Sequence, residues 1–218
     1  MPRLQLSHQR VIETEKQNIG KIILFCEGIT EKYYFDYFAE IINKDENKYN
    51  NVVITTETAN GNAQTVLNHS IHFLSQEDNN RLFANYDKYL VFDCDAPDDI
   101  ASVITQAIAN SNDYHLLVSN HFFETWLLMH FEEVEEKLSK RKTYARLSDH
   151  LNAKYKKGQK GKTREIISNG DIEKAIENAY KLENQYKATG KTIYDSIDDM
   201  NPYTNVHALV EQLMLLIS

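Results

Sequence analysis

The chain has 218 residues, enough for one domain with a substantial buried core, and its 42% hydrophobic and 26% charged residues are typical of a folded globular protein. Residues 1–20 lack the apolar core of a signal peptide, and no apolar run reaches the roughly 18 residues that a membrane span needs. Only two cysteines are present, Cys26 and Cys94, which excludes a disulfide framework and indicates small buried residues. We therefore expect a cytoplasmic protein.

Short apolar runs alternate with helical patterns through the first 131 residues. Strands are predicted at 21–26, 51–56, 88–92 and 114–119. Helices are predicted after each strand, at 30–42, from Gly61 to about 76, from Pro97 to about 109, and up to 131. Strands that alternate with helices form a parallel sheet covered on both faces, so we predict an α/β fold with a four-stranded, mostly parallel sheet.

The alternation stops after residue 132. Helical patterns follow near 143–156, 171–188 and 203–217, and the run GQKGKTR at 158–164 is typical of a mobile basic loop. We predict two units: an α/β domain over residues 1–132 and a basic, helical C-terminal extension over residues 133–218 that packs on it.

Carboxylates follow two of the predicted strands at the point where each strand ends. Glu27 comes directly after the first strand, and Asp93 and Asp95 lie at the end of the third. Sites in open parallel sheets form outside the carboxyl ends of the strands, and an extended chain would place Asp93 and Asp95 on the same side. Glu31 shares a helix face with Glu27 if the helix begins that early. Clustered carboxylates repel one another unless a cation separates them, so the pattern indicates a site for a divalent cation such as Mg²⁺ or Ca²⁺, with solvated loop acids as the alternative.

Glu124 needs a different argument, because the segment HFFETWLLMHF at 121–131 is apolar almost all round and should be buried. A lone carboxylate on such a helix is costly unless it is paired or neutralised. The sequence is equally compatible with a basic side chain and with a metal ion as the group that neutralises Glu124. His121 and His130 are more typical of core or capping histidines than of metal ligands, because an oxygen-rich site favours a hard cation over zinc.

The charge is distributed unevenly along the chain. The net charge is -8, yet residues 137–164 hold eleven Lys or Arg residues against one acid, Asp149. Such asymmetry is typical of a surface that contacts a polyanion, although a solvated helical surface would show it too. The candidates for contact with a nucleic-acid backbone are Lys156, Lys157, Lys160, Lys162 and Arg164.

Four segments in order carry a family resemblance: FCEGITEKYYF, VFDCDAP, SNHFFETWLLMHF and NPYTNVHALVEQL. Together they resemble the RloB-like family, whose core is a TOPRIM domain of the kind found in topoisomerases, primases and OLD-type nucleases. The resemblance implies a TOPRIM-like (Rossmann-like) catalytic domain with divalent metal at Glu27, Asp93 and Asp95. It also implies proton transfer by Glu27, and Glu31 matches the second acid of the OLD-like EGxxE pattern. A role in antiphage defence and an ABC-type ATPase partner follow from the same resemblance.

Two positions depart from the family pattern. His121 stands where Pro is usual in the SNPxFE motif, and Cys94 stands between the two aspartates where a basic residue is common. Neither change removes a carboxylate, so we expect any consequence to fall on substrate preference.

These observations lead to one main hypothesis and two alternatives. The main hypothesis is a metal-dependent nuclease that cleaves RNA, with tRNA as one candidate, or DNA. It would use Mg²⁺ or Mn²⁺ held by Glu27, Asp93 and Asp95, helped by Glu31 and Glu124. One alternative is a dehalogenase-like phosphatase with Asp93 as nucleophile, although that family usually carries its DxD on the first strand. The other alternative is a non-catalytic TOPRIM-like sensor that binds the ATPase partner.

Overall fold

The computed structural model describes residues 19–45, 48–49, 51–95 and 99–217. The predicted helix start at Pro97 lies outside these ranges, and so do residues 1–18 of the segment for which no signal peptide was predicted. The strands are β1 (Lys21–Cys26), β2 (Val53–Thr58), β3 (Asp87–Asp93), β4 (Tyr114–Asn120) and β5 (Tyr203–Thr204). The helices are α2 (Ile29–Ile42), α3 (Ala63–Ser75), α4 (Glu77–Leu82), α5 (Ile100–Ile108), α6 (Glu124–Met129), α7 (Lys140–His150), α8 (Lys160–Asn169), α9 (Ile172–Ala188) and α10 (His207–Ile217), with a short 3₁₀ turn η1 (Ile197–Asp199).

The five described strands form one sheet in the order β2-β1-β3-β4-β5. The four strands expected from the sequence are all present and pair in parallel, which confirms an α/β fold with a mostly parallel sheet. β5 is added to the edge of β4 and runs antiparallel to it, with Asn120 opposite Tyr203. Because β1, β3 and β4 are neighbours and point the same way, their carboxyl ends meet at one edge of the sheet.

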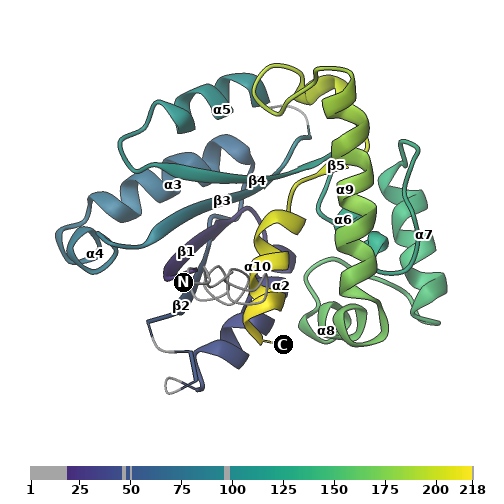
Figure 1. Cartoon of the computed structure of the whole chain (residues 1–218), viewed down its shortest axis with the longest axis horizontal. Helices are drawn as coiled ribbons and strands as arrows, with labels where there is room; N and C mark the ends of the chain where they lie inside the picture. The colour runs from purple at the N-terminus through teal and green to yellow at the C-terminus, as the bar shows by residue number, and fades with distance from the viewer. Residues whose placement is uncertain (1–18, 46–47, 50, 96–98, 218) are drawn as a thin grey trace, which may run out of the picture.

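Alternating side chains along the central strands fill two hydrophobic layers, one on each face of the sheet. Ile22 and Leu24 of β1 join the layer that packs under α2, α6, α8, α9 and α10. Ile23 and Phe25 point the other way and pack with α3, α5 and η1. Figure 1 shows this three-layer arrangement, with α3 and α5 on one side of the sheet and α2 and α10 on the other.

The structure corrects the sequence prediction at three places in the C-terminal half. The segment 158–164, predicted to be a mobile loop, leads into a regular helix, because α8 begins at Lys160 and buries Thr163, Ile166 and Ile167. The predicted helix over 203–217 is divided into β5 and the shorter α10. The predicted helix near 143–156 begins and ends earlier, at Lys140 and His150. The sheet therefore has five described strands instead of four, and the boundary at residue 132 stays a prediction.

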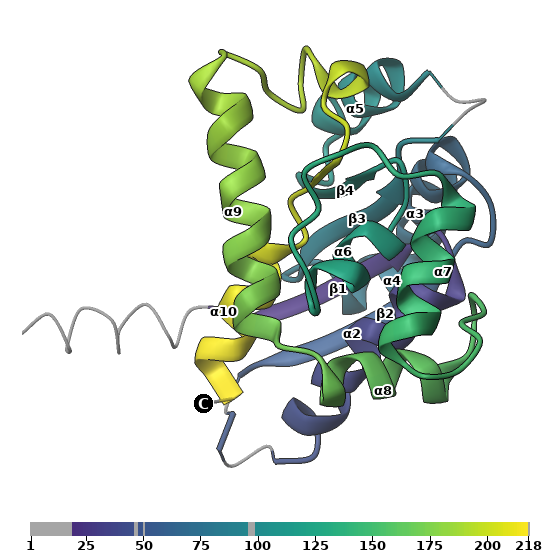
Figure 2. The same ribbon diagram turned by 90° about the vertical axis from the view of Figure 1, so that its right-hand side faces the viewer.

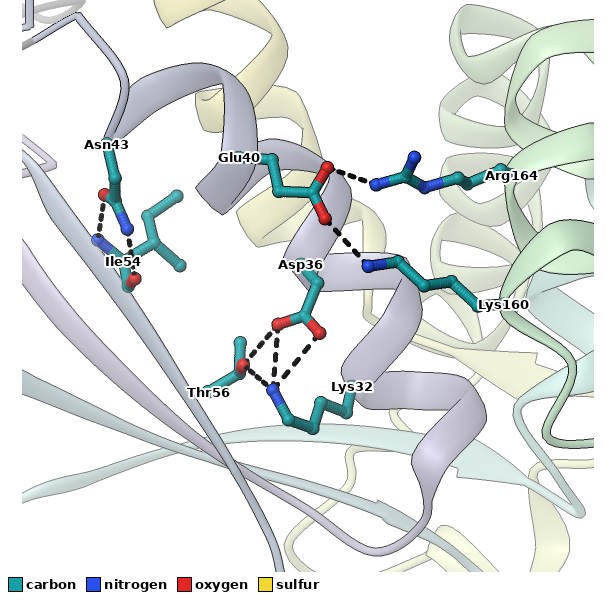
Figure 3. Close-up of polar contacts among 8 residues, drawn as sticks. All are labelled: Lys32, Asp36, Glu40, Asn43, Ile54, Thr56, Lys160 and Arg164. Carbon is teal, nitrogen blue, oxygen red and sulfur yellow. Dashed lines mark hydrogen bonds and ion pairs between the residues drawn. The ribbon is translucent and has the colours of Figure 1, made fainter.

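Two asparagine side chains bind the backbone of strands near the edges of the sheet. Asn43, just after α2, accepts a hydrogen bond from the backbone N–H of Ile54 in β2 and donates one to its carbonyl, at 3.0 and 2.8 Å (Figure 3). Asn205 accepts from the N–H of Val118 at 2.7 Å and donates to the carbonyl of Leu116 at 2.8 Å. Each amide side chain thus pairs with polar backbone groups that would otherwise be left open at an edge.

A polar network holds α2 against β2. Lys32 lies 3.0 Å from the carboxylate of Asp36 one turn later and donates a hydrogen bond to the hydroxyl of Thr56 at 2.7 Å (Figure 3). Thr56 in turn donates to Asp36. The N-terminal turns of α2, which carry Glu31, are therefore fixed relative to the sheet.

No helix in the described ranges combines the length and the apolar character that crossing a membrane requires.

Candidate functional site

Three carboxylates predicted from the sequence meet at the carboxyl edge of the sheet. Glu27 follows the last residue of β1, and Asp93 is the last residue of β3. Glu124 opens α6, four residues after the end of β4. Glu31 joins them from the first turn of α2. All four side chains are at least nine-tenths buried, and Glu31 and Glu124 are fully buried.

Backbone hydrogen bonds fix Asp93 and link the three strand ends. The N–H of Asp93 donates to Oε2 of Glu27 at 2.9 Å. The N–H of Phe123, at the entrance to α6, donates to Oδ1 of Asp93 at 2.7 Å. Two carboxylates thus accept hydrogen bonds from main-chain donors whose positions the sheet and the start of α6 determine.

Lys157 supplies positive charge to this cluster. Its ammonium nitrogen lies 3.2 Å from Oε1 of Glu31 and 3.6 Å from Oδ2 of Asp93. The residue belongs to the segment between α7 and α8, and the N–H of Gly158 donates to the hydroxyl of Thr30 in α2 at 2.8 Å. This bond places Lys157 over the carboxylates although the two segments are far apart in the sequence.

Gly28 leaves the space that this contact needs. A Cβ atom at Gly28 would lie 2.8 Å from Oε2 of Glu31 and 3.6 Å from the Cε atom of Lys157. The φ angle of Gly28 is -135°, which any residue can adopt, so the reason for a glycine here is the close approach of the Glu31 carboxylate, which a larger residue would displace. Its position inside the EGxxE pattern is therefore explained by packing around Glu31.

Glu124 is bound by two tyrosines that the sequence argument did not find. The hydroxyls of Tyr144 and Tyr155 both donate to Oε1 of Glu124, at 3.2 and 3.1 Å. The two rings meet edge to face, 5.0 Å apart. Lys157 also attracts Glu124 electrostatically. A basic side chain and two hydroxyls thus stabilise the buried carboxylate, in line with one of the two partners considered for it.

Burial raises the pKa of the carboxylates and so makes them easier to protonate. It raises the pKa of Glu27 to about 7, even though the hydrogen bond from Asp93 acts in the opposite direction. Burial and the negative charge of Glu31 raise the pKa of Asp93, and burial raises that of Glu124. Burial lowers the pKa of Lys157, but the attraction of Glu31, Asp93 and Glu124 outweighs it and leaves the pKa above the usual lysine value.

The donor chemistry fits a hard divalent cation. Oε2 of Glu31 and Oε2 of Glu124 are buried and have no hydrogen-bond partner among the described residues. An all-oxygen donor set of carboxylates suits Mg²⁺ or Mn²⁺. Over the described ranges, however, no group of three or more His, Cys, Asp or Glu side chains is close enough together to hold a metal ion. In this structure the ammonium of Lys157 provides the positive charge that the carboxylates require.

Asp95 and His130 lie outside this cluster. Asp95 is half-buried two residues beyond β3, and within the described part of the chain it makes no hydrogen bond or ion pair; its charge acts on Glu27 through space. His130 is a core histidine, as expected, with its ring nitrogens 3.1 Å from the hydroxyl of Tyr34 and 3.1 Å from the carbonyl of Trp126. Burial lowers the pKa of His130 to about 4.

The basic residues predicted to contact nucleic acid have different surroundings. Lys160 and Arg164 of α8 both pair with Glu40 of α2, the lysine at 2.9 Å (Figure 3). Lys162 pairs with Glu165 at 2.6 Å. Lys156 is exposed. Four of the five candidates, Lys157 included, are therefore ion-paired within the protein. This pairing could not be predicted from the sequence, because every acid except Glu165 lies in another segment.

Fold and site together define an α/β protein with a buried cluster of carboxylates at the carboxyl edge of a mostly parallel sheet. The family model of RloB-like proteins matches residues 22–213, nearly the whole chain. The protein therefore belongs to the RloB-like family. No curated protein and no solved structure matches the chain.

Proposed function

We propose that the protein is a metal-dependent nuclease that hydrolyses phosphodiester bonds of RNA or DNA as the effector of an antiphage defence system. The observation that carries the proposal is the buried cluster of Glu27, Glu31, Asp93 and Glu124, in which two carboxylate oxygens have no partner in the described residues. Nothing in the packing of the core requires four acids at one strand edge, so a functional reason is favoured. Membership of the RloB-like family supports the defence role and an ABC-type ATPase as partner.

The side chains have distinct roles in this proposal. A bound Mg²⁺ or Mn²⁺ would supply an activated water and stabilise negative charge on the reacting phosphate, and Glu27, Glu31, Asp93 and Glu124 are the residues that would hold it. Glu27, whose pKa is raised to about 7, can hold or release a proton at neutral pH. The hydrogen bond from Phe123 orients Asp93. Lys157 would then move from Glu31 toward the phosphate, where its charge opposes that of the scissile group.

The test is cleavage of labelled tRNA, other RNA and DNA with added Mn²⁺ by the wild type and by Asp93→Asn. Asn keeps an oxygen that can accept from Phe123, so the variant should fold while losing the charge. Asp87→Asn is the matched control, because Asp87 lies exposed at the other end of the same strand. We expect cleavage by the wild type and by the control, and none by Asp93→Asn. Equal cleavage by all three proteins would end the proposal.

One observation favours a second candidate, a non-catalytic module that binds the ATPase partner. The ion pair between Lys157 and Glu31 already neutralises part of the cluster without a metal. A module of this kind would bind Mn²⁺ weakly and would cleave no substrate with or without the ATPase. Calorimetric titration of Mn²⁺ into the wild type and Asp93→Asn, with the cleavage assay repeated in the presence of the ATPase, separates the two functions.

A further inference from the structure

Two parts of the basic stretch differ in how their charges are balanced. In α8, Lys160, Lys162 and Arg164 are all paired with glutamates. At the start of α7, the side chains of Lys140 and Lys142 make no ion pair or hydrogen bond within the described ranges, and the same holds for Lys137 just before the helix. Between these two helices, the charge that is free to meet a polyanion therefore lies at the start of α7 and not in α8.

These lysines line a hollow of about 400 Å³. Its lining includes His121, Phe122, Lys137, Ser139, Lys140 and Lys142. His121 and Phe122 directly precede Phe123, which donates to Asp93, and Glu124. α7 packs beside α6, as Figure 2 shows. A ligand in the hollow would thus contact the residues that directly precede Phe123 and Glu124 in the chain, while none of the four carboxylates lines the hollow itself.

The first turn of α7 carries charges that a helix does not favour. The N-terminus of a helix has a partial positive charge, which acidic residues usually complement. Here the first turn has no acid, and Lys140, Arg141 and Lys142 occupy it after the N-cap Ser139. The arrangement weakens the helix unless an anion is bound, and such local conflicts are typical of binding sites.

The hollow also offers an aromatic surface of a kind that binds bases. The rings of His121 and Phe122 are nearly parallel, with 19° between their planes and 6.5 Å between their centroids. Phe122 is buried, whereas His121 is partly exposed. Histidine rings stack on unpaired bases, and a base must leave the duplex before it can do so. The volume of the hollow is in the range for a small ligand and does not fit a double helix.

We propose that this hollow binds one nucleotide of a single-stranded nucleic acid, with its phosphate at Lys137, Lys140 and Lys142 and its base on the ring of His121. The inference rests on the proposed function, whose substrate it narrows to an unpaired segment beside the carboxylate cluster.

Binding is measured by fluorescence anisotropy with a labelled single-stranded oligonucleotide about 12 nucleotides long, as RNA and as DNA. All proteins carry Asp93→Asn, so the measurement does not depend on cleavage. The variant pair is Lys140→Gln/Lys142→Gln, and the matched control is Lys160→Gln/Lys162→Gln, which removes the same charge from the paired helix. His121→Ala tests stacking, with a duplex of the same sequence as the competing ligand.

We expect the α7 double variant to weaken binding and to reduce the slope of log K against log salt by about 1.4, which corresponds to two contacts on a single strand. The α8 control should change the slope much less. His121→Ala should weaken single-strand binding about fivefold, the lower end of the effect of one stacked base. Thermal melting should show that the α7 double variant is at least as stable as its parent, since it removes unfavourable charge.

Several outcomes would overturn the inference. They are no binding of any single strand, equal loss of binding in the α7 and α8 variants, or a duplex that binds as tightly as the single strand and is indifferent to His121→Ala. Failure of the proposed function would be recognised by a different result. If the wild type binds single strands through α7 but never cleaves them, the proposed nuclease activity is wrong, whereas the proposed binding site is supported.

Discussion

Replacement of Lys157 by Met tests the electrostatic basis of the site. The change removes the cation that lies 3.2 Å from Glu31 and 3.6 Å from Asp93, and the thioether cannot replace its charge. Loss of one partner from a buried ion pair destabilises a protein by about 3–5 kcal/mol. The Lys157 side chain is 31% exposed, so water screens part of the attraction and we expect the lower end, about 3 kcal/mol.

For a chain of this size, a loss of about 3 kcal/mol corresponds to a fall in Tm of roughly 6–12 °C. Lys156→Met is the matched control, because Lys156 is the adjacent residue, is exposed and makes no ion pair with the described residues; its effect should stay within about 0.5 kcal/mol. Urea denaturation at several pH values provides the free energies of unfolding for both variants.

The pH dependence of the free energy of unfolding is a second test of the role of Lys157. Lys157 lowers the pKa of Glu27, Asp93 and Glu124, so its removal raises these values further above those of the unfolded chain. A folded state with raised carboxyl pKa values takes up protons before the unfolded state does, so its stability increases as the pH falls. The deficit of Lys157→Met should therefore shrink from pH 8 toward about pH 5. A deficit equal to that of Lys156→Met, or one that stays constant with pH, would refute the role of Lys157 as the counter-charge.

Three further predictions test other features of the fold and the site. His130 has a folded pKa of about 4 and an unfolded value near 6.5, so the unfolded state takes up the proton first. Urea denaturation should therefore show that the wild type loses about 3 kcal/mol relative to His130→Gln between these pH values, a difference that excludes the opposite contribution of the carboxylates common to both proteins. Gly161→Ala should raise Tm by about 1–3 °C, because alanine is a better helix former and no atom lies within 4 Å of the new Cβ. Gly170→Ala should lower Tm, because its Cβ would lie 2.7 Å from the Cβ of His130. Tyr155→Phe removes a hydrogen bond to Glu124 and should reduce the free energy of unfolding by about 1–2 kcal/mol in urea. Tyr33→Phe, at a half-buried tyrosine of α2 whose hydroxyl makes no hydrogen bond with the described residues, should show no such loss.

The sequence predicted the central sheet and most of the acidic cluster because both depend on local patterns. Apolar runs identify buried strands, and in a parallel sheet the residues that end neighbouring strands meet at one edge. Glu27 and Asp93 follow from this rule alone. Glu124 was harder to interpret, because its burial was predictable while its partners, Tyr144 and Tyr155, lie in a later segment.

The parts that escaped prediction depend on contacts between distant segments. The glycines at 158 and 161 favoured a loop, but Ile166 and Ile167 bury enough surface for α8 to tolerate Gly161 inside its first turn. β5 has two residues, too few for an alternating pattern to be visible. Lys157 looked like any other lysine of a basic run, and only its approach to Glu31 across the fold distinguishes it.

The side-chain amides of Asn43 and Asn205 have a consequence for the protein's behaviour at high concentration. An exposed strand edge invites pairing with another copy of the chain, and these two amides each engage backbone groups that a foreign strand would need. Deamidation of either asparagine to aspartate would replace the amide nitrogen that donates to the strand carbonyl by a carboxylate oxygen, which carries a negative charge. Slow chemical ageing at these two positions would therefore open the sheet to self-association without changing a single core residue.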